Sequence, residues 1–128
     1  MKALFLLGRL AFGGFFLYNA IHHFKETEGL AAYAGSKGVP NADQAVLASG
    51  ALLAVGATSI LLGVKPKIGA LALVTFLATV SPAMHDFWNA QDEGEHMNQV
   101  IHFSKNIALL GAALALLGVP EPWPASLG

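Results

Sequence analysis

Four apolar stretches, each about as long as a membrane-crossing helix, alternate with short clusters of charged residues. A helix needs about 20 mainly apolar residues to cross the hydrocarbon core of a bilayer. The stretches predict helices at about 3–24, 43–63, 68–84 and 99–117. The expected fold is therefore all-α, a membrane-embedded four-helix bundle with up-down topology, built as a single transmembrane domain over residues 1–128.

The composition also predicts a surface that faces lipid. Charged residues make up 12% of the chain and hydrophobic residues 55%, whereas a soluble domain carries about 25% charged residues. The net charge of -1 gives no indication of nucleic acid as a partner. The lack of cysteine excludes disulfides, thiolate metal sites and thiol catalysis.

The segment between the first two predicted helices contains several helix breakers. Gly35, Gly38 and Pro40 are expected to keep residues 25–42 free of helix. Asp43 is the expected N-cap of the second helix. The connection is thus predicted to be an irregular loop.

The positive charges indicate the orientation of the bundle. One end of the predicted path carries Lys2, Arg9, Lys65 and Lys67. The loop expected at residues 86–98 is acidic and falls at the other end. The positive-inside bias then predicts a multi-pass protein of the cell inner (plasma) membrane with both termini cytoplasmic.

Two residues near the termini are expected at the membrane surface. Arg9 lies about two turns into the first helix, so its side chain is expected to reach the lipid headgroups. Trp123 lies between prolines and is expected to anchor the tail at the interface.

Histidines occur where the apolar stretches meet water at one predicted membrane face. His22 and His23 end the first stretch, His85 ends the third, and His102 opens the fourth. Further polar residues accompany these histidines. Three share a helix face with one of them at helical spacing, namely Asn19, Lys105 and Asn106, and Asp86 directly follows His85. Polar groups at membrane depth are costly unless they pair or serve a function. These residues therefore predict an inward-facing site on three helices at the outer face.

A quinone-like ligand is the preferred occupant of this site. Quinones need hydrogen-bond donors for their carbonyl oxygens, a titratable group, and apolar or aromatic walls. The predicted catalytic residues are His85 and His102, which would exchange protons, and Asp86, which would tune a histidine. The predicted ligand-binding residues are His22, His23, Asn19, Trp88, Lys105 and Asn106.

Other hypotheses remain open. The same histidines could ligate a metal ion or haem, or form a proton path. Haem or metal is less favoured, because no tight ligand motif such as His-Glu-x-x-His occurs. A non-catalytic membrane adaptor or assembly protein is the alternative from another class. Its helices would hold a partner protein or a second copy through small residues, which are frequent at 48–59.

Four blocks of residues recur together in a known family. They are Gly8-Arg9 leading to Asn19-x-x-His22-His23, the turn at 63–67, His85-Asp86-Phe87-Trp88, and His102-Phe103-x-Lys105-Asn106. The chain resembles the DoxX family of small four-helix membrane proteins over essentially its whole length. The family is named for a subunit associated with archaeal thiosulfate:quinone oxidoreductase.

The resemblance implies a subunit of a membrane oxidoreductase complex, linked in some bacterial relatives to oxidative stress and sulfur metabolism. It also makes the last two blocks the expected core of the site. The chain has neither cysteine nor a nucleotide-binding motif. Any redox chemistry is therefore expected to need a bound cofactor or a redox partner protein.

Overall fold

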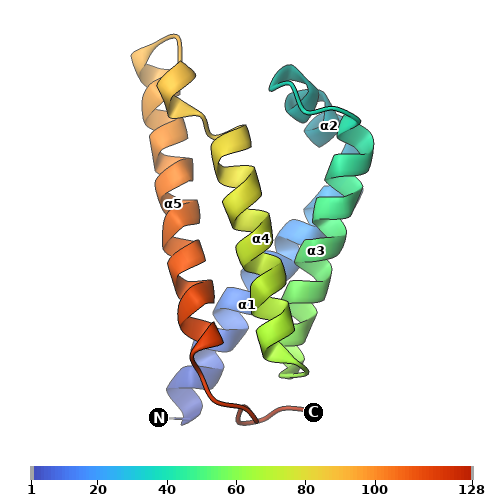
Figure 1. Ribbon diagram of the computed structural model, residues 1–128, viewed down its shortest axis with the longest axis vertical. Coiled ribbons are helices and arrows are strands. Elements are labelled where there is room, and N and C mark those ends of the chain that lie inside the picture. The colour runs from blue at the N-terminus through green and yellow to red at the C-terminus, as the bar shows by residue number, and fades with distance from the viewer. Residues whose placement is uncertain (1, 128) are drawn as a thin grey trace.

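Four long helices run up and down between the two ends of an elongated bundle (Figure 1). The computed structural model describes residues 2–127. Its elements are α1 (Lys2–Lys25), α2 (Thr27–Ser36), α3 (Ala42–Leu62), α4 (Pro66–Met84), the short 3₁₀ helix η1 (Phe87–Asn89) and α5 (Glu93–Leu117). α3 packs between α1 and α4, and α5 packs against α4. The predicted all-α bundle with up-down topology is confirmed.

Both termini lie at one end of the bundle, which we call the terminal end (Figure 1). The opposite end carries α2, η1 and the predicted histidines, and we call it the histidine end. Within residues 2–127, four helices are long and apolar enough to cross a membrane. Large apolar side chains such as Leu7, Val55 and Leu114 are exposed along them. The protein is therefore a multi-pass membrane protein whose apolar helix faces contact the bilayer.

The expectation of an irregular loop at 25–42 is wrong, because Thr27–Ser36 forms helix α2. Its sequence contains three alanines, which have high helix propensity. Ala31 and Ala34 are buried where α2 packs against α3. The expected interruption of the helix occurs only after its last turn, where Gly38 adopts a positive φ of 84°.

The helix starts also differ from prediction. α5 begins at Glu93 rather than near 99, because Asp92 accepts a hydrogen bond from the Glu95 backbone N–H at 2.7 Å. The Glu95 carboxylate in turn accepts one from the Gln91 backbone N–H at 3.2 Å. Asp43 is not an N-cap, since α3 already starts at Ala42 with Asn41 in the cap position. The other helix ends agree closely with prediction.

Glycines bring α3 and α4 together near the terminal end. A methyl group at Gly56 would lie 2.7 Å from the Leu73 side chain and 3.0 Å from the Gly69 carbonyl oxygen. One at Gly69 would lie 2.5 Å from the Ser59 side chain. The two helices therefore approach closely at this level, and they diverge toward the histidine end (Figure 1).

Arg9 is buried at the terminal end, so the expectation that it reaches the headgroups is wrong. Its guanidinium donates to the carbonyl oxygens of Ile60 and Leu61 in the last turn of α3, each at 3.0 Å. It also donates to the carbonyl oxygens of Pro124 and Ala125 in the tail. A guanidinium carries five donors, and here they join α1, α3 and the tail.

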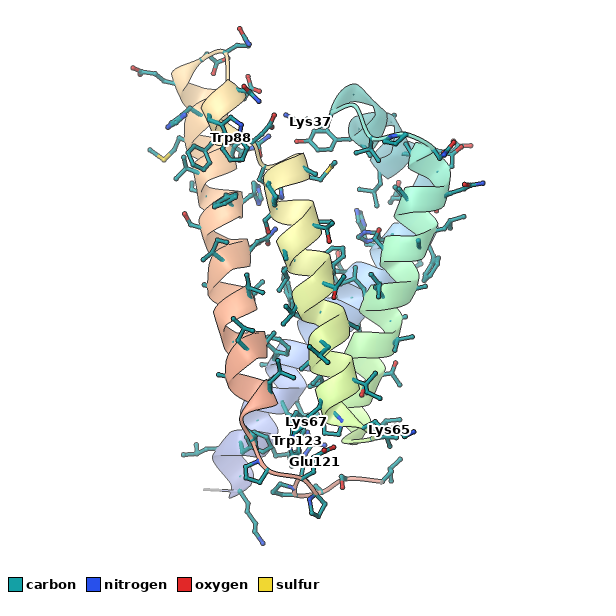
Figure 2. All side chains as sticks on the ribbon, viewed as in Figure 1. Lys37, Lys65, Lys67, Trp88, Glu121 and Trp123 are labelled. Atoms are coloured by element: carbon teal, nitrogen blue, oxygen red, sulfur yellow. The ribbon has the colours of Figure 1, made fainter. Side chains whose placement is uncertain are left out.

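Trp123 is likewise buried, at 2% exposure, and is not a surface anchor. Its ring packs edge-on against Phe5 and lies 5.5 Å from the Arg9 guanidinium carbon. The tail runs across the terminal end of the bundle (Figure 2). Leu127 N–H donates to the Leu62 carbonyl oxygen at 2.9 Å, which extends this attachment.

Candidate functional site

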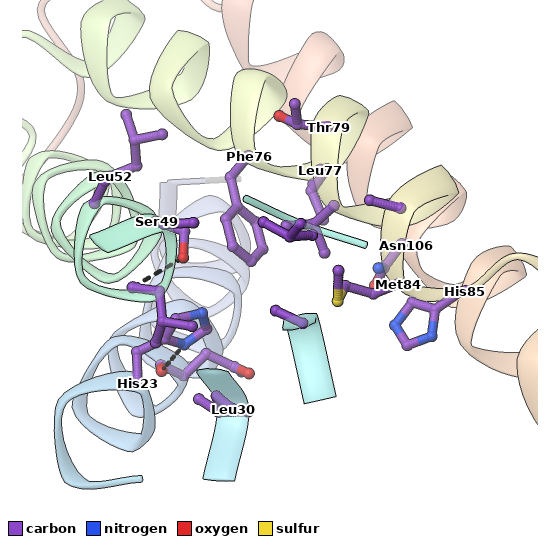
Figure 3. Close-up of a pocket in the computed structure, with 18 of the residues that line it drawn as sticks. His23, Leu30, Ser49, Leu52, Phe76, Leu77, Thr79, Met84, His85 and Asn106 are labelled. Carbon is purple, nitrogen blue, oxygen red and sulfur yellow. Dashed lines mark hydrogen bonds between the residues drawn. The ribbon is translucent and has the colours of Figure 1, made fainter. Parts of the chain in front are cut away.

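A cavity of about 480 Å³ lies where α3 and α4 diverge toward the histidine end. All five α-helices contribute to its lining. Most of the wall is apolar, with Phe16, Leu52, Phe76, Leu77 and Met84 among the lining side chains (Figure 3). Its volume falls in the usual range for small-molecule sites, about 300–1,000 Å³.

Polar side chains occupy a minor part of the wall. They include residues from the predicted site: Asn19, His23, His85, Lys105 and Asn106. Tyr33, Ser49 and Thr79 line the cavity as well. The structure thus brings predicted polar residues of α1, α4 and α5 to one cavity, as an apolar ligand site with a few polar groups requires.

Asn106 is the most enclosed of these polar side chains, at 6% exposure. It makes no side-chain hydrogen bond with any residue in the described range 2–127, and its amide reaches the open space of the cavity. Figure 3 shows it beside Met84 and His85. An amide that faces an apolar cavity without a protein partner has its hydrogen-bonding groups free for water or a ligand.

His85 belongs to a hydrogen-bonded chain that fixes its tautomer. The Tyr33 hydroxyl donates to the Met84 carbonyl oxygen at 2.8 Å and accepts from Gln99 Nε2 at 3.0 Å. Gln99 Oε1 therefore faces His85, with His85 Nδ1 at 2.8 Å. Since an amide oxygen only accepts, Nδ1 carries the hydrogen, and Nε2 of the neutral ring has the free lone pair.

His102 does not line the cavity but stacks on the ring of His85. The centroids are 5.0 Å apart and the ring planes differ by 19°. His102 therefore contacts His85, which borders the cavity, and not the cavity itself. The predicted catalytic histidines are therefore adjacent, and only His85 lies at the cavity wall.

Asp86 lies outside the cavity, in an ion pair with Lys37 at 2.6 Å. Both side chains are 18% exposed. The hydrogen bond to the Asp86 carboxylate is the main cause that raises the pKa of Lys37 above its ordinary value. Asn89 Nδ2 also donates to this carboxylate, at 3.2 Å. The pair thus joins the segment after α2 to the end of α4.

Two other predicted residues are also away from the cavity. His22 is exposed on the outside of α1, while His23 one position later lines the cavity and contacts the Asn19 carbonyl oxygen through Nδ1 at 2.9 Å. Trp88 is exposed and packs against Phe87 and Phe103 instead. The roles assigned to all these residues remain predictions.

Gln99 and Tyr33 are site residues that the sequence analysis missed. Gln99 is 7% exposed, and it connects His85 to Tyr33. Its signal was present, because Gln99, His102 and Asn106 are spaced i, i+3, i+7 on one helix face. Placing the start of the last helix near residue 99 concealed this signal.

The described residues contain no group of three or more histidine, aspartate or glutamate side chains positioned to hold a metal ion. His23 faces Phe76, with ring centroids 5.8 Å apart, whereas His85 and His102 face each other. The cavity instead presents a mainly apolar wall, and the Asn106 amide in it has no partner in the part of the chain that the structure describes.

Four apolar helices and a cavity of ligand size define a small polytopic helical membrane protein. Comparison with family models matches residues 4–86 to DoxX, which is more than half of the chain. The protein therefore belongs to the DoxX family. Neither the curated proteins nor the solved structures give a match.

Proposed function

We propose that this DoxX-family protein binds a quinone-like molecule in the cavity and serves as a subunit of a membrane redox complex. The observation that carries the proposal is Asn106, whose side chain is 6% exposed, faces an apolar cavity and has no hydrogen-bond partner among residues 2–127. A quinone ring would fill such a space, and its carbonyl oxygen would accept a hydrogen bond from the Asn106 amide.

His85 is the proposed proton-exchanging residue. It borders the cavity, and its Nδ1–H is engaged by Gln99. Nε2 is then the nitrogen available to take up or release a proton. His102, stacked on this ring, would influence proton exchange through His85. The electrons would come from or pass to a partner protein, since this chain has no cysteine.

We further propose that the histidine end faces the outside of the cell inner membrane and that both termini are cytoplasmic. Lys65 and Lys67 lie at the terminal end (Figure 2). At the histidine end, Lys37 is paired with Asp86, and Glu93 and Glu95 begin α5. With Lys2 and Arg9, the terminal end carries four of the seven lysine and arginine residues, whereas the histidine half carries Lys25, Lys105 and the paired Lys37. Positive charge is therefore greater at the terminal end, as the positive-inside bias requires of a cytoplasmic side.

Ligand binding to the protein in lipid nanodiscs tests the proposal. A short-tailed ubiquinone and a short-tailed menaquinone should bind the wild type, and Asn106→Leu should weaken binding by roughly tenfold, the effect of losing one hydrogen bond to a buried group. Asn98→Leu is the matched control, since Asn98 is exposed on the same helix. Wild-type protein that binds neither quinone would contradict the proposal and favour a non-catalytic adaptor.

A further inference from the structure

The histidine end of the cavity is covered by α2. Leu30, Tyr33 and Ala34 of this helix belong to the lining. Two contacts join this region to the end of α4: the Tyr33–Met84 hydrogen bond and the Lys37–Asp86 ion pair. Figure 2 shows Lys37 reaching across from α2 toward that end. A ligand coming from water would have to pass this cover.

The side of the cavity between α3 and α4 has exposed lining residues. Ala48 and Leu52 of α3, and Thr79 and Ala83 of α4, border the cavity and are also exposed on the surface of the bundle. At 1.5 Å per residue, Ala48 and Leu52 lie roughly 9–15 Å from the start of α3. This level is within the hydrocarbon core of a bilayer. These exposed lining residues are thus at a depth that a membrane-dissolved molecule can reach.

Charge on the described cavity wall is positive and comes from a lysine. Among the described lining residues there is no aspartate or glutamate, while Lys105 is present. Lys105 has no acidic partner within residues 2–127, and its ammonium lies 5.8 Å from the centroid of the Phe15 ring. It is one residue before Asn106 and one turn deeper in the bundle than His102. A cation at this depth is costly unless a counter-charge accompanies it.

From these observations we infer that the cavity takes from the bilayer an amphiphile with an anionic head group, held by Lys105 and Asn106. This inference rests on the proposal that the cavity is a ligand site, and it specifies the class of ligand. The head would be an oxygen anion on a small or flat group. Lys105 supplies the charge and the Asn106 amide supplies a hydrogen bond. The hydrocarbon tail would leave between α3 and α4 into the lipid.

A matched pair of probes separates charge from shape. The probes are a hydroxynaphthoquinone with an undecyl tail, at a pH where its hydroxyl is ionised and imidazole is neutral, and the neutral methyl ether of the same molecule. Binding is measured in nanodiscs of zwitterionic phosphatidylcholine. The variants are Lys105→Met, Lys105→Arg and the control Lys67→Met, which removes an exposed lysine at the terminal end.

The wild type should bind the ionised probe at least about tenfold more tightly than the ether, because a charge-assisted hydrogen bond is stronger than a neutral one. Lys105→Met should abolish this preference, whereas Lys105→Arg and Lys67→Met should retain it. Dodecanoate should compete with the ionised probe more strongly than dodecanol does if the head can be a fatty-acid carboxylate. A preference confined to the naphthoquinone would restrict the ligand to ionised quinones.

Two results would overturn the inference and leave the proposed function standing. One is equal binding of both probes to the wild type. The other is a charge preference that survives in Lys105→Met, which would mean that the lysine only extends toward the headgroups. A wild type that binds neither these probes nor the quinones would instead overturn the proposed function itself.

Discussion

The rings of His85 and His102 stack with their centroids 5.0 Å apart and 19° between their planes. Two stacked imidazoles cannot both become charged without mutual repulsion. The hydrogen bond between His85 Nδ1 and Gln99 Oε1 orients the first ring of this pair. Gln99 of α5, which is outside the described lining of the cavity, thus controls which nitrogen of His85 can exchange a proton.

The tautomer of His85 gives the first prediction. In Gln99→Leu the Nδ1–H loses its acceptor, so neutral His85 should populate both tautomers in place of one. Nitrogen NMR shifts of histidine-labelled protein distinguish the two forms directly. Asn98→Leu, one position earlier and exposed, should leave His85 unchanged. A single Nδ1–H tautomer persisting in Gln99→Leu would mean that another group holds the ring.

The Lys37–Asp86 pair gives a prediction on pH. The pKa of Lys37 is raised in the folded protein, chiefly by the hydrogen bond to Asp86. Its stabilisation is therefore fully present below the ordinary lysine pKa of about 10.4 and is lost as the pH rises through the raised value. The protection of α2 against hydrogen exchange, taken relative to the intrinsic base-catalysed rate, should fall over that range.

The same pair can be tested by mutation. Lys37→Met should lower the protection of α2 already at neutral pH and remove its alkaline fall. The effect should correspond to less than about 1 kcal/mol, since the pair lies near water. Lys25→Met, at the end of α1 where Lys25 is exposed, is the control. An unaltered alkaline fall in protection in Lys37→Met would assign that fall to a different group.

The four membrane helices were predictable because each has a long apolar stretch bounded by charge. Helix α2 was not, because its alanines are a weaker signal than the glycines and proline around them. Its stability depends on packing against α3, which a local pattern does not report. The expectation of a loop therefore missed the element that covers the cavity.

Helical spacing and the predicted up-down path were together enough to group Asn19, His23, His85, Lys105 and Asn106, which all line one cavity. It could not distinguish His22 from His23, since both follow Asn19 at helical spacings and only the rotation of α1 in the bundle separates them. The placement of Asp86 depends on Lys37, which is 49 residues away in the chain. Long-range pairing of this kind has no signature in the local sequence.

The close approach of α3 and α4 gives a prediction on stability. Gly69→Ala would place a methyl group 2.5 Å from Ser59 and 3.1 Å from the Gly56 carbonyl oxygen. The helices would have to separate, at a cost of about 1–3 kcal/mol. The midpoint of thermal unfolding in detergent should fall, and quinone binding should weaken because the cavity walls move apart.

Gly111→Ala is the matched control for this prediction. Gly111 is in the membrane helix α5, and a methyl group there would meet nothing within 4 Å. Its unfolding midpoint should stay the same or rise slightly, because alanine has the higher helix propensity. Equal midpoints for the two variants would show that α3 and α4 do not pack tightly at this level in solution.

Arg9 gives the last prediction, since four backbone carbonyls from α3 and the tail converge on its guanidinium. Arg9→Met should release the tail and destabilise the protein by about 3 kcal/mol or more, because a buried hydrogen-bonded network loses its donor. Arg9→Lys should be intermediate, since an ammonium has three donors and no planar fork.

Release of the tail by Arg9→Met can be followed by fluorescence. In a Trp88→Phe background Trp123 is the single tryptophan, so its emission should shift to longer wavelength as it leaves the contact with Phe5. Lys67→Met, at the same end of the bundle but exposed, should leave the emission unchanged. If Arg9→Met kept both the emission and the stability of the background protein, the tail would be held by its apolar contacts and the Leu127–Leu62 hydrogen bond alone.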